Sequence, residues 1–142
     1  MDDIRQVLLF QIERTTKLSK VYSQRIFDQE GVDITIEQWI LLKIIHENQP
    51  LSQKQIAEKS LRDPAAITRT VDILEKKGLV TRQRSTVDRR QHDMYLTQNG
   101  KQFITDHFPL VQGMRDQSMK GLSNEELKTL QELLRKVQSN FE

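Results

Sequence analysis

The chain repeats apolar residues at every third or fourth position over most of its 142 residues. That spacing is the period of a helix with one buried face, whereas a half-buried strand alternates at every second position. The first such segment starts at the N-terminus and should end near Gly31, where glycine favours a helix stop. We therefore predict a long first helix. Its apolar positions are Ile4, Val7, Leu8, Ile12, Leu18, Val21, Tyr22 and Ile26.

Three further helix starts carry one local signature. Thr35, Ser52 and Ser123 each stand three positions before a glutamine or glutamate, which is the spacing of a capping box. Helices are therefore predicted to begin near residues 35, 52 and 123. The helix after Thr35 should end before Pro50. Its predicted inner face consists of Ile36, Trp39, Ile40, Lys43 and Ile44.

A short helix, a tight turn and a second helix are predicted between residues 52 and 78. Ile56 and Ala57 are the core positions of the short helix. Asp63 followed by Pro64 marks the start of the second helix. The Asp side chain can accept hydrogen bonds from the free amides of the first turn. Pro suits the first helical position because the amide hydrogen that it lacks would have no partner there. Gly78 supplies a left-handed stop. This order is a helix-turn-helix, whose second helix buries Ile67, Val71 and Leu74.

Two β-prone segments, LVTRQR and HDMYLT, flank a polar tip after the helix-turn-helix and predict a hairpin, or wing. Thr97 can cap a helix from about residue 98, and Pro109 with Gly113 predicts a kink or break of that helix near residue 108. The predicted fold class is mainly α: an α+β winged helix-turn-helix with about six helices and a two- to three-stranded wing.

The last segment has the spacing of helices that pack lengthwise on a partner. Its apolar residues step by three, four, three and four positions. This seam could cover the core of its own chain. Together with the long first helix, it leaves more apolar helical surface than one winged domain can cover, so we favour a homodimer. The predicted dimerisation residues are Ile4, Leu8, Ile12, Leu127, Leu130, Leu134, Val137 and Phe141.

The length suits one domain, which we divide into an N-terminal dimerisation helix (1–31), a winged module (32–100) and C-terminal dimerisation helices (101–142). The chain has no cysteine, which excludes disulfides, thiolate catalysis and thiol redox sensing. It shows neither a spanning apolar run nor a signal peptide, so we expect a cytoplasmic protein that does not contact membranes.

Positive charge gathers in the middle of the chain. Residues 51–100 carry ten basic and six acidic side chains, while the rest carries twelve basic and fourteen acidic ones. A basic middle between mildly acidic ends is typical of a nucleic-acid-binding module with assembly segments, although a solvated basic face without a partner has the same charge pattern.

The outward side of the 64–77 helix and the wing are the candidate DNA contacts. Small residues in the first turn allow close approach to a major groove, where Thr68 can meet a base edge and Arg69 can bind guanine through two hydrogen bonds. An arginine at the wing tip gains attraction in a minor groove, with Asp88 orienting it. The predicted DNA-binding residues are Ser52, Gln53, Lys54, Ala65, Ala66, Thr68, Arg69, Arg84, Asp88, Arg89 and Arg90.

The run from Asp63 to Gly100 resembles the recognition helix and wing of the MarR family of bacterial transcriptional regulators. The similarity lies in LEKKGLV, in the sequence Asp88-Arg89-Arg90, and in LTQNG at 96–100. It implies an obligate homodimer on an imperfect inverted repeat in double-stranded DNA. It also implies that Arg90 enters the minor groove with Asp88 as its supporting acid. Such regulators are more often repressors than activators.

The resemblance also implies that a small aromatic or phenolic effector, an oxidant or a metal releases DNA by binding between the dimerisation helices and the winged module. Oxidation through cysteine is excluded. The three histidines lack ligand spacing, so we expect no metal site and no cofactor. Four residues could line an effector cavity, although such positions are more often plain core: Phe10, Tyr22, Trp39 and Met114.

Other function classes have less support in the sequence. No phosphate-binding glycine loop, nucleophile elbow or cofactor fingerprint is present, so we do not expect an enzyme. A winged-helix module for architectural DNA binding or protein contact, without an effector, is the remaining alternative. The sequence leaves the effector and the target DNA unspecified.

Overall fold

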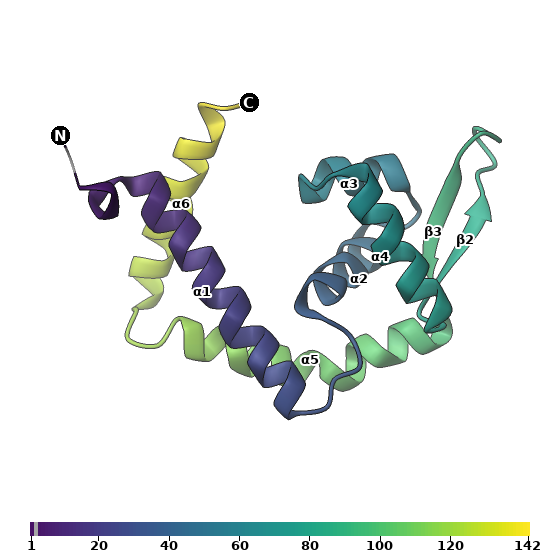
Figure 1. Cartoon of the computed structure of the whole chain (residues 1–142), viewed down its shortest axis with the longest axis horizontal. Helices are drawn as coiled ribbons and strands as arrows, with labels where there is room; N and C mark the ends of the chain where they lie inside the picture. Colours follow the sequence, from purple (N-terminus) through teal and green to yellow (C-terminus); the bar gives the residue numbers. More distant parts are fainter. Residues whose placement is uncertain (2) are drawn as a thin grey trace. The chain divides into compact units, whose positions relative to one another are not determined.

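The computed structural model describes residue 1 and residues 3–142 and confirms a mainly α winged helix-turn-helix fold (Figure 1). Among these described residues, a 3-10 turn at Ile4–Gln6 precedes six α-helices. The helices are α1 (Leu8–Gln29), α2 (Ile36–Asn48), α3 (Gln53–Ser60), α4 (Pro64–Lys76), α5 (Gln98–Ser118) and α6 (Asn124–Ser139). The strands are β1 (Leu51–Ser52), β2 (Val80–Arg84) and β3 (His92–Leu96). The chain forms two compact units, Met1–Phe108 and Pro109–Glu142.

The predicted helix starts are confirmed at the level of individual hydrogen bonds. Thr35, Ser52 and Ser123 each accept from the amide three residues ahead. The side-chain oxygen of that third residue in turn accepts from the backbone amide of the cap residue. Asp63 accepts from the amide of Ala66 and stands before Pro64, the first residue of α4. The local sequence thereby fixes where α2, α3, α4 and α6 begin.

A small antiparallel sheet carries the wing. Its strand order is β1-β3-β2, and β2 pairs with β3 from Val80 opposite Leu96 to Arg84 opposite His92. The short strand β1 pairs Leu51 with Met94, which is fully buried. The third strand therefore ties the start of the helix-turn-helix to the base of the wing.

The joint between α4, the wing and α5 has a close backbone contact. Gly78 takes a left-handed conformation (φ 73°) that ends α4, as predicted. Thr97 accepts from the amide of Gly100 at 2.9 Å and donates to the carbonyl of Gly78 at 2.6 Å. A side chain at Gly100 would place its Cβ 2.1 Å from the carbonyl oxygen of Leu79. Only glycine fits there without a shift of the backbone.

The core of the first unit lies under the helix-turn-helix. The predicted inner residues of α4, Ile67, Val71 and Leu74, are fully buried. The inner face predicted for α2 is wrong in part, because Ile40 is 44% exposed and Leu41, Leu42 and Ile45 are buried. Trp39 is buried as predicted, with its ring edge-on to Phe27 at 6.2 Å between centroids and its Nε1 without a hydrogen-bond partner among the described residues.

Two predicted helix boundaries need correction. The first helix does not include Ile4, which belongs to the separate 3-10 turn, because Val7 is extended and interrupts the helix. Of the kink or break predicted near residue 108, the break is absent, because α5 runs from Gln98 to Ser118 with Pro109 inside it. Proline removes one helical hydrogen bond, and the other bonds of a long helix can carry it past that position.

The second unit contains the rest of α5 and the terminal helix α6. Val111 and Met114 of α5 are buried. No residue of α6 is buried, and Leu130 of its apolar seam is 46% exposed. Phe141, which the sequence placed in the same seam, lies beyond the end of the helix at Ser139 and is 73% exposed. Hydrogen bonds from the backbone amide and then the hydroxyl of Ser123 hold the pKa of Glu126 below its ordinary value, which strengthens the cap of α6. Among the described residues, no helix is long and apolar enough to cross a bilayer.

Candidate nucleic-acid interface

The outward face of α4 presents the predicted reading residues to solvent. Ala65, Thr68 and Arg69 are exposed and Ala66 is partly exposed, opposite the buried face of the helix. No ion pair to Arg69 is present in the part of the chain that the structure describes. Small side chains at the first turn and a free guanidinium in the second suit close approach to an anionic groove.

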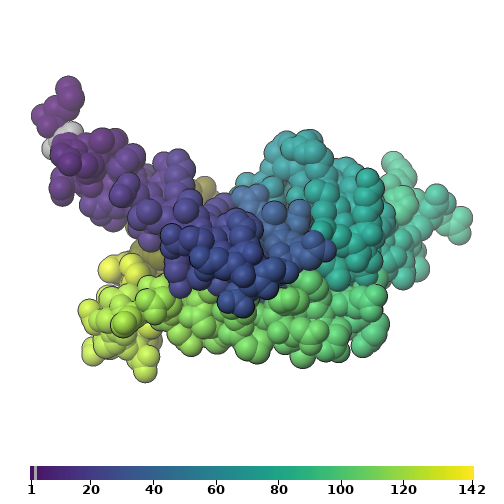
Figure 2. Space-filling view, turned by 60° about the horizontal axis from the view of Figure 1, so that its bottom comes forward, coloured from purple at the N-terminus to yellow at the C-terminus, as the bar shows by residue number. Residues whose placement is uncertain are grey.

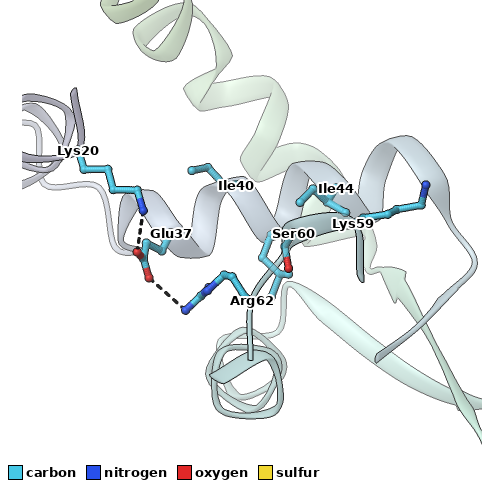
Figure 3. Close-up of a pocket in the computed structure, with 8 residues that line it drawn as sticks. Lys20, Glu37, Ile40, Ile44, Lys59, Ser60 and Arg62 are labelled. Carbon is cyan, nitrogen blue, oxygen red and sulfur yellow. Dashed lines mark hydrogen bonds and ion pairs between the residues drawn. The ribbon is translucent and has the colours of Figure 1, made fainter. Parts of the chain in front are cut away.

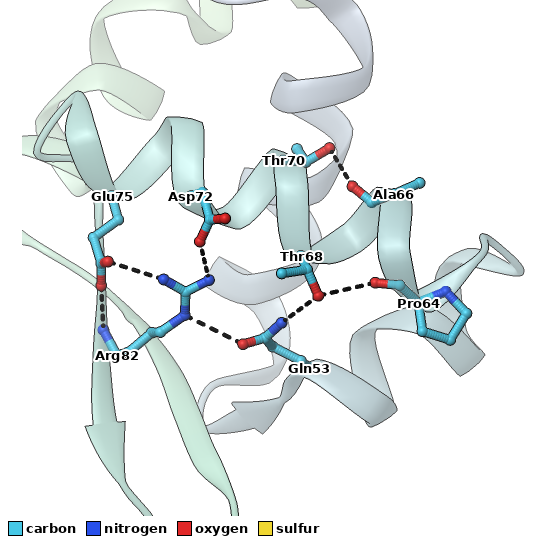
Figure 4. Close-up of polar contacts among 8 residues, drawn as sticks. All are labelled: Gln53, Pro64, Ala66, Thr68, Thr70, Asp72, Glu75 and Arg82. Carbon is cyan, nitrogen blue, oxygen red and sulfur yellow. Dashed lines mark hydrogen bonds and ion pairs between the residues drawn. The ribbon is translucent and has the colours of Figure 1, made fainter.

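Behind this face lies a polar network that the sequence analysis missed (Figure 4). Arg82 of β2 donates to Asp72 at 2.5 Å and to Glu75 at 2.9 Å, both on α4. It also donates to the side-chain oxygen of Gln53 at 3.2 Å, and Gln53 in turn donates to the hydroxyl of Thr68 at 3.0 Å. In the sequence Arg82 counted only as one of the basic residues of the middle segment. The structure makes it the joint between the wing, α4 and the start of α3.

The start of α3 contributes two of its three predicted residues to the surface. Gln53 is partly exposed and Lys54 is exposed. Ser52 is only 4% exposed, and its hydroxyl accepts from the amide of Gln55 as the helix cap. Its side chain therefore serves as the helix cap, and its contact with DNA stays a prediction. A hollow of about 230 Å³ brings these residues together with the wing; it is lined by Ser52, Gln53, Lys54, Arg90, Gln91 and His92.

The wing tip is held by its own backbone. Ser85 is 8% exposed, and its hydroxyl accepts from the amides of Val87 and Asp88, each at 3.2 Å. The carboxylate of Asp88 accepts from the amide of Arg90 at 3.0 Å, whereas its distance to Arg90 Nε is 3.9 Å. Asp88 thus holds the tip through the backbone amide of Arg90 and through a longer ion pair to the guanidinium of the same residue.

The arginines of the wing project from this tip. The side chain of Arg90 is 95% exposed, and Arg84 and Arg89 are exposed as well. In Figure 2 the tip of the wing stands clear of the helices of its unit. The structure therefore presents guanidinium groups on a finger next to the outward face of α4, which can meet two neighbouring stretches of one anionic surface.

Two of the four residues predicted to line an effector cavity lie far apart on one helix. Phe10 and Tyr22 are twelve positions apart on α1, which is about 18 Å along a helix. Trp39 is packed in the core, and Met114 belongs to the second unit. The ring of Tyr22 is covered by the guanidinium of Arg25 at 5.9 Å.

A different pocket, of about 290 Å³, lies beside the turn of the helix-turn-helix (Figure 3). Ile40, Leu41 and Ile44 of α2 form its apolar wall. Glu37 lies between two cations of the pocket, at 3.2 Å from Lys20 Nζ and 3.1 Å from Arg62. Lys59 and Ser60 complete the lining. Three cations and one anion give the pocket a net positive charge beside its apolar wall, which favours an anionic over a cationic small molecule. Among the described residues, no three His, Asp or Glu side chains gather as a metal site would require.

Comparisons with known proteins agree with this geometry. The model of the MarR family matches residues 34–92, from the start of α2 to the wing. A mutant MarR from E. coli, solved in complex with operator DNA, is 25% identical; the match covers 96% of this chain and 99% of that one, with a TM-score of 0.80.

Two further solved structures show the same fold at lower identity. A MarR/EmrR family transcriptional regulator from Acinetobacter sp. ADP1 is 21% identical, with 99% of this chain and 98% of that chain covered and a TM-score of 0.89. BpsR from Bordetella bronchiseptica, whose DNA binding is regulated by 6-hydroxynicotinic acid, is 17% identical, with 97% of each chain covered and a TM-score of 0.86.

Proposed function

We propose that the chain, whose winged module matches the model of the MarR family over residues 34–92, is a transcriptional regulator that binds double-stranded DNA. The observation that carries the proposal is the joint exposure of Arg69 on α4 and Arg90 on the wing. A helix in the major groove with an arginine in the adjacent minor groove accounts for both. The E. coli MarR structure with operator DNA supports this reading.

The regulator acts as a homodimer on an inverted repeat. The support is that α6 buries no residue, and that Leu8 of α1 is 56% exposed, so that apolar surface at both chain ends has no cover in the single chain. Two copies related by a twofold axis present their α4 helices to half-sites about 34 Å apart, one turn of DNA. Such a dimer across a promoter excludes polymerase, which makes repression the simplest outcome.

A small anionic effector releases the DNA. The pocket beside Glu37 supports this step, because Arg62 directly precedes Asp63, the cap of α4. An anion that competes with Glu37 for Arg62 would loosen the contact between α2 and the turn that leads into α4. Only a ligand with different affinity for the two arrangements can shift their populations. That BpsR responds to 6-hydroxynicotinic acid is consistent with an acidic aromatic ligand.

Selection of bound sequences from a random DNA pool tests the proposal. We expect an imperfect inverted repeat whose half-site centres are one turn of DNA apart. The selected DNA then serves to screen carboxylic acids against their amides for loss of binding. A protein that binds every duplex with the same affinity, at the same salt concentration, would not be a sequence-specific regulator.

A further inference from the structure

The hydrogen-bond directions in the Arg82 network are fixed by chemistry, because a guanidinium can only donate. The three acceptors around it are carboxylate oxygens of Asp72 and Glu75 and the side-chain oxygen of Gln53. The side chain of Arg82 is 21% exposed, so these bonds are partly shielded from water. Of the two orientations of the Gln53 amide, only the one with its oxygen toward Arg82 gives a hydrogen bond to the guanidinium.

The direction continues from Gln53 to α4 (Figure 4). With its oxygen on Arg82, the amide nitrogen of Gln53 faces Thr68 and donates to its hydroxyl at 3.0 Å. The hydroxyl of Thr68, which accepts from Gln53, donates its own hydrogen to the carbonyl of Pro64 at 3.1 Å. An amide nitrogen carries two hydrogens, so one N–H of Gln53 has no partner within this network.

We propose that Arg82 is a positioning residue that makes Gln53 a donor-only reader of DNA bases. This inference rests on the proposed function, namely that α4 lies in a major groove, because Gln53 is hydrogen-bonded to Thr68 of that helix. A free glutamine pairs with adenine by accepting from N6 and donating to N7 at the same time. Gln53 cannot do so while its oxygen is held by Arg82, and its remaining N–H fits an acceptor.

The consequence is a preference for keto over amino bases at the position that Gln53 meets. Guanine O6 and thymine O4 are acceptors in the major groove, whereas adenine N6 and cytosine N4 are donors. If the remaining N–H of Gln53 meets the amino group of adenine or cytosine, two donors face each other and no hydrogen bond forms. Arg82 also offsets one of the two negative charges that Asp72 and Glu75 place on this helix, which lowers their repulsion of phosphate.

The test compares DNA selections with the full-length protein and three variants. Gln53→Ala identifies the base position that Gln53 controls, because only there should the preference disappear. Arg82→Met with Asp72→Asn removes one positive and one negative charge, so the net charge of the module is kept while the oxygen of Gln53 is released. Asp72→Asn alone is the matched control, in which Arg82 still holds Gln53 and Glu75. Circular dichroism and thermal unfolding establish that each variant is folded.

We expect the wild type and Asp72→Asn to select guanine or thymine at the Gln53 position, by roughly tenfold over adenine. The double variant should accept adenine at least as well, while its salt dependence stays that of the wild type, since no phosphate contact is lost. Should the double variant fail to fold, the keto preference of the wild type and its loss in Gln53→Ala still decide the matter.

Adenine or cytosine selected by the wild type at the Gln53 position would overturn the inference, as would a Gln53→Ala variant that selects the wild-type half-site. In both cases a recovered inverted repeat would leave the proposed function standing. A wild-type protein that selects no sequence at all overturns the proposed function and this inference with it.

Discussion

Arg90 shows at the residue scale how the backbone aims a side chain. Asp88 holds the amide of Arg90 at 3.0 Å, while the guanidinium projects into solvent and is 95% exposed. The cost of presenting the cation is low because water solvates it in the free protein, and a minor groove can replace that water by focused negative potential. The wing is therefore prepared before DNA arrives.

Arg90→Ala should weaken binding to the selected operator chiefly through its outer flanks, with a flatter dependence of affinity on salt, because about one phosphate-proximal cation is lost per subunit. Fluorescence anisotropy at several salt concentrations measures both. Arg5→Ala is the matched control, since Arg5 is an exposed arginine paired with Asp3 outside the winged module. Unchanged affinity and slope in Arg90→Ala would remove the wing from the interface.

Individual residues also mark where sequence reasoning stopped. Asp63, Ser123 and Gly78 could be assigned because their partners lie within four residues. The role of Arg82 could not, because Gln53 lies 29 positions away in the sequence and is brought close only by the sheet. Spacing in a sequence gives only the neighbours along the chain. An arginine that bonds within the fold therefore cannot be distinguished by sequence from one that is exposed.

At the scale of elements, the contact between α5 and the turn that precedes β2 depends on one glycine, Gly100. Gly100→Ala should destabilise the fold by about 1–3 kcal/mol, because the new Cβ would meet the carbonyl of Leu79, which cannot rotate away. Urea unfolding followed by circular dichroism measures the change. Gly113→Ala, also in α5, is the control: no atom lies within 4 Å of its Cβ, so it should gain up to about 1 kcal/mol from helix propensity. Equal stability of the two variants would mean that the close contact is absent.

The elements themselves were predicted better than their faces. Capping boxes gave the starts of three helices, because a cap is a local structure. The buried side of α2 was assigned in part wrongly, since apolar residues surround this helix and its period favours no single side; Leu41, Leu42 and Ile45 took the core and left Ile40 outside. When the sequence of a helix favours no single side, the elements that pack against it determine which side is buried.

At the scale of the whole molecule, the homodimer that we propose would use the exposed apolar seam of α6 as part of its interface. Leu130→Asp should convert the dimer to a monomer at micromolar concentrations, because a charge would replace an apolar residue that is 46% exposed in the single chain. Light scattering after size exclusion measures the mass. Lys128→Asp, an exposed position on the opposite side of α6, is the control and should stay dimeric. A Leu130→Asp protein with the mass of the wild type would assign the seam to another role.

The chain contains one tryptophan, and its ring lies edge-on against Phe27 where α1 meets α2. Its emission is therefore a label-free optical reporter of this helix joint, with no competing indole to subtract. Any event that tilts α1 against α2 has to alter the contact between the two rings. Quenching or a spectral shift during titration with an acid or with DNA would give the stoichiometry and the timing of that movement in one cuvette.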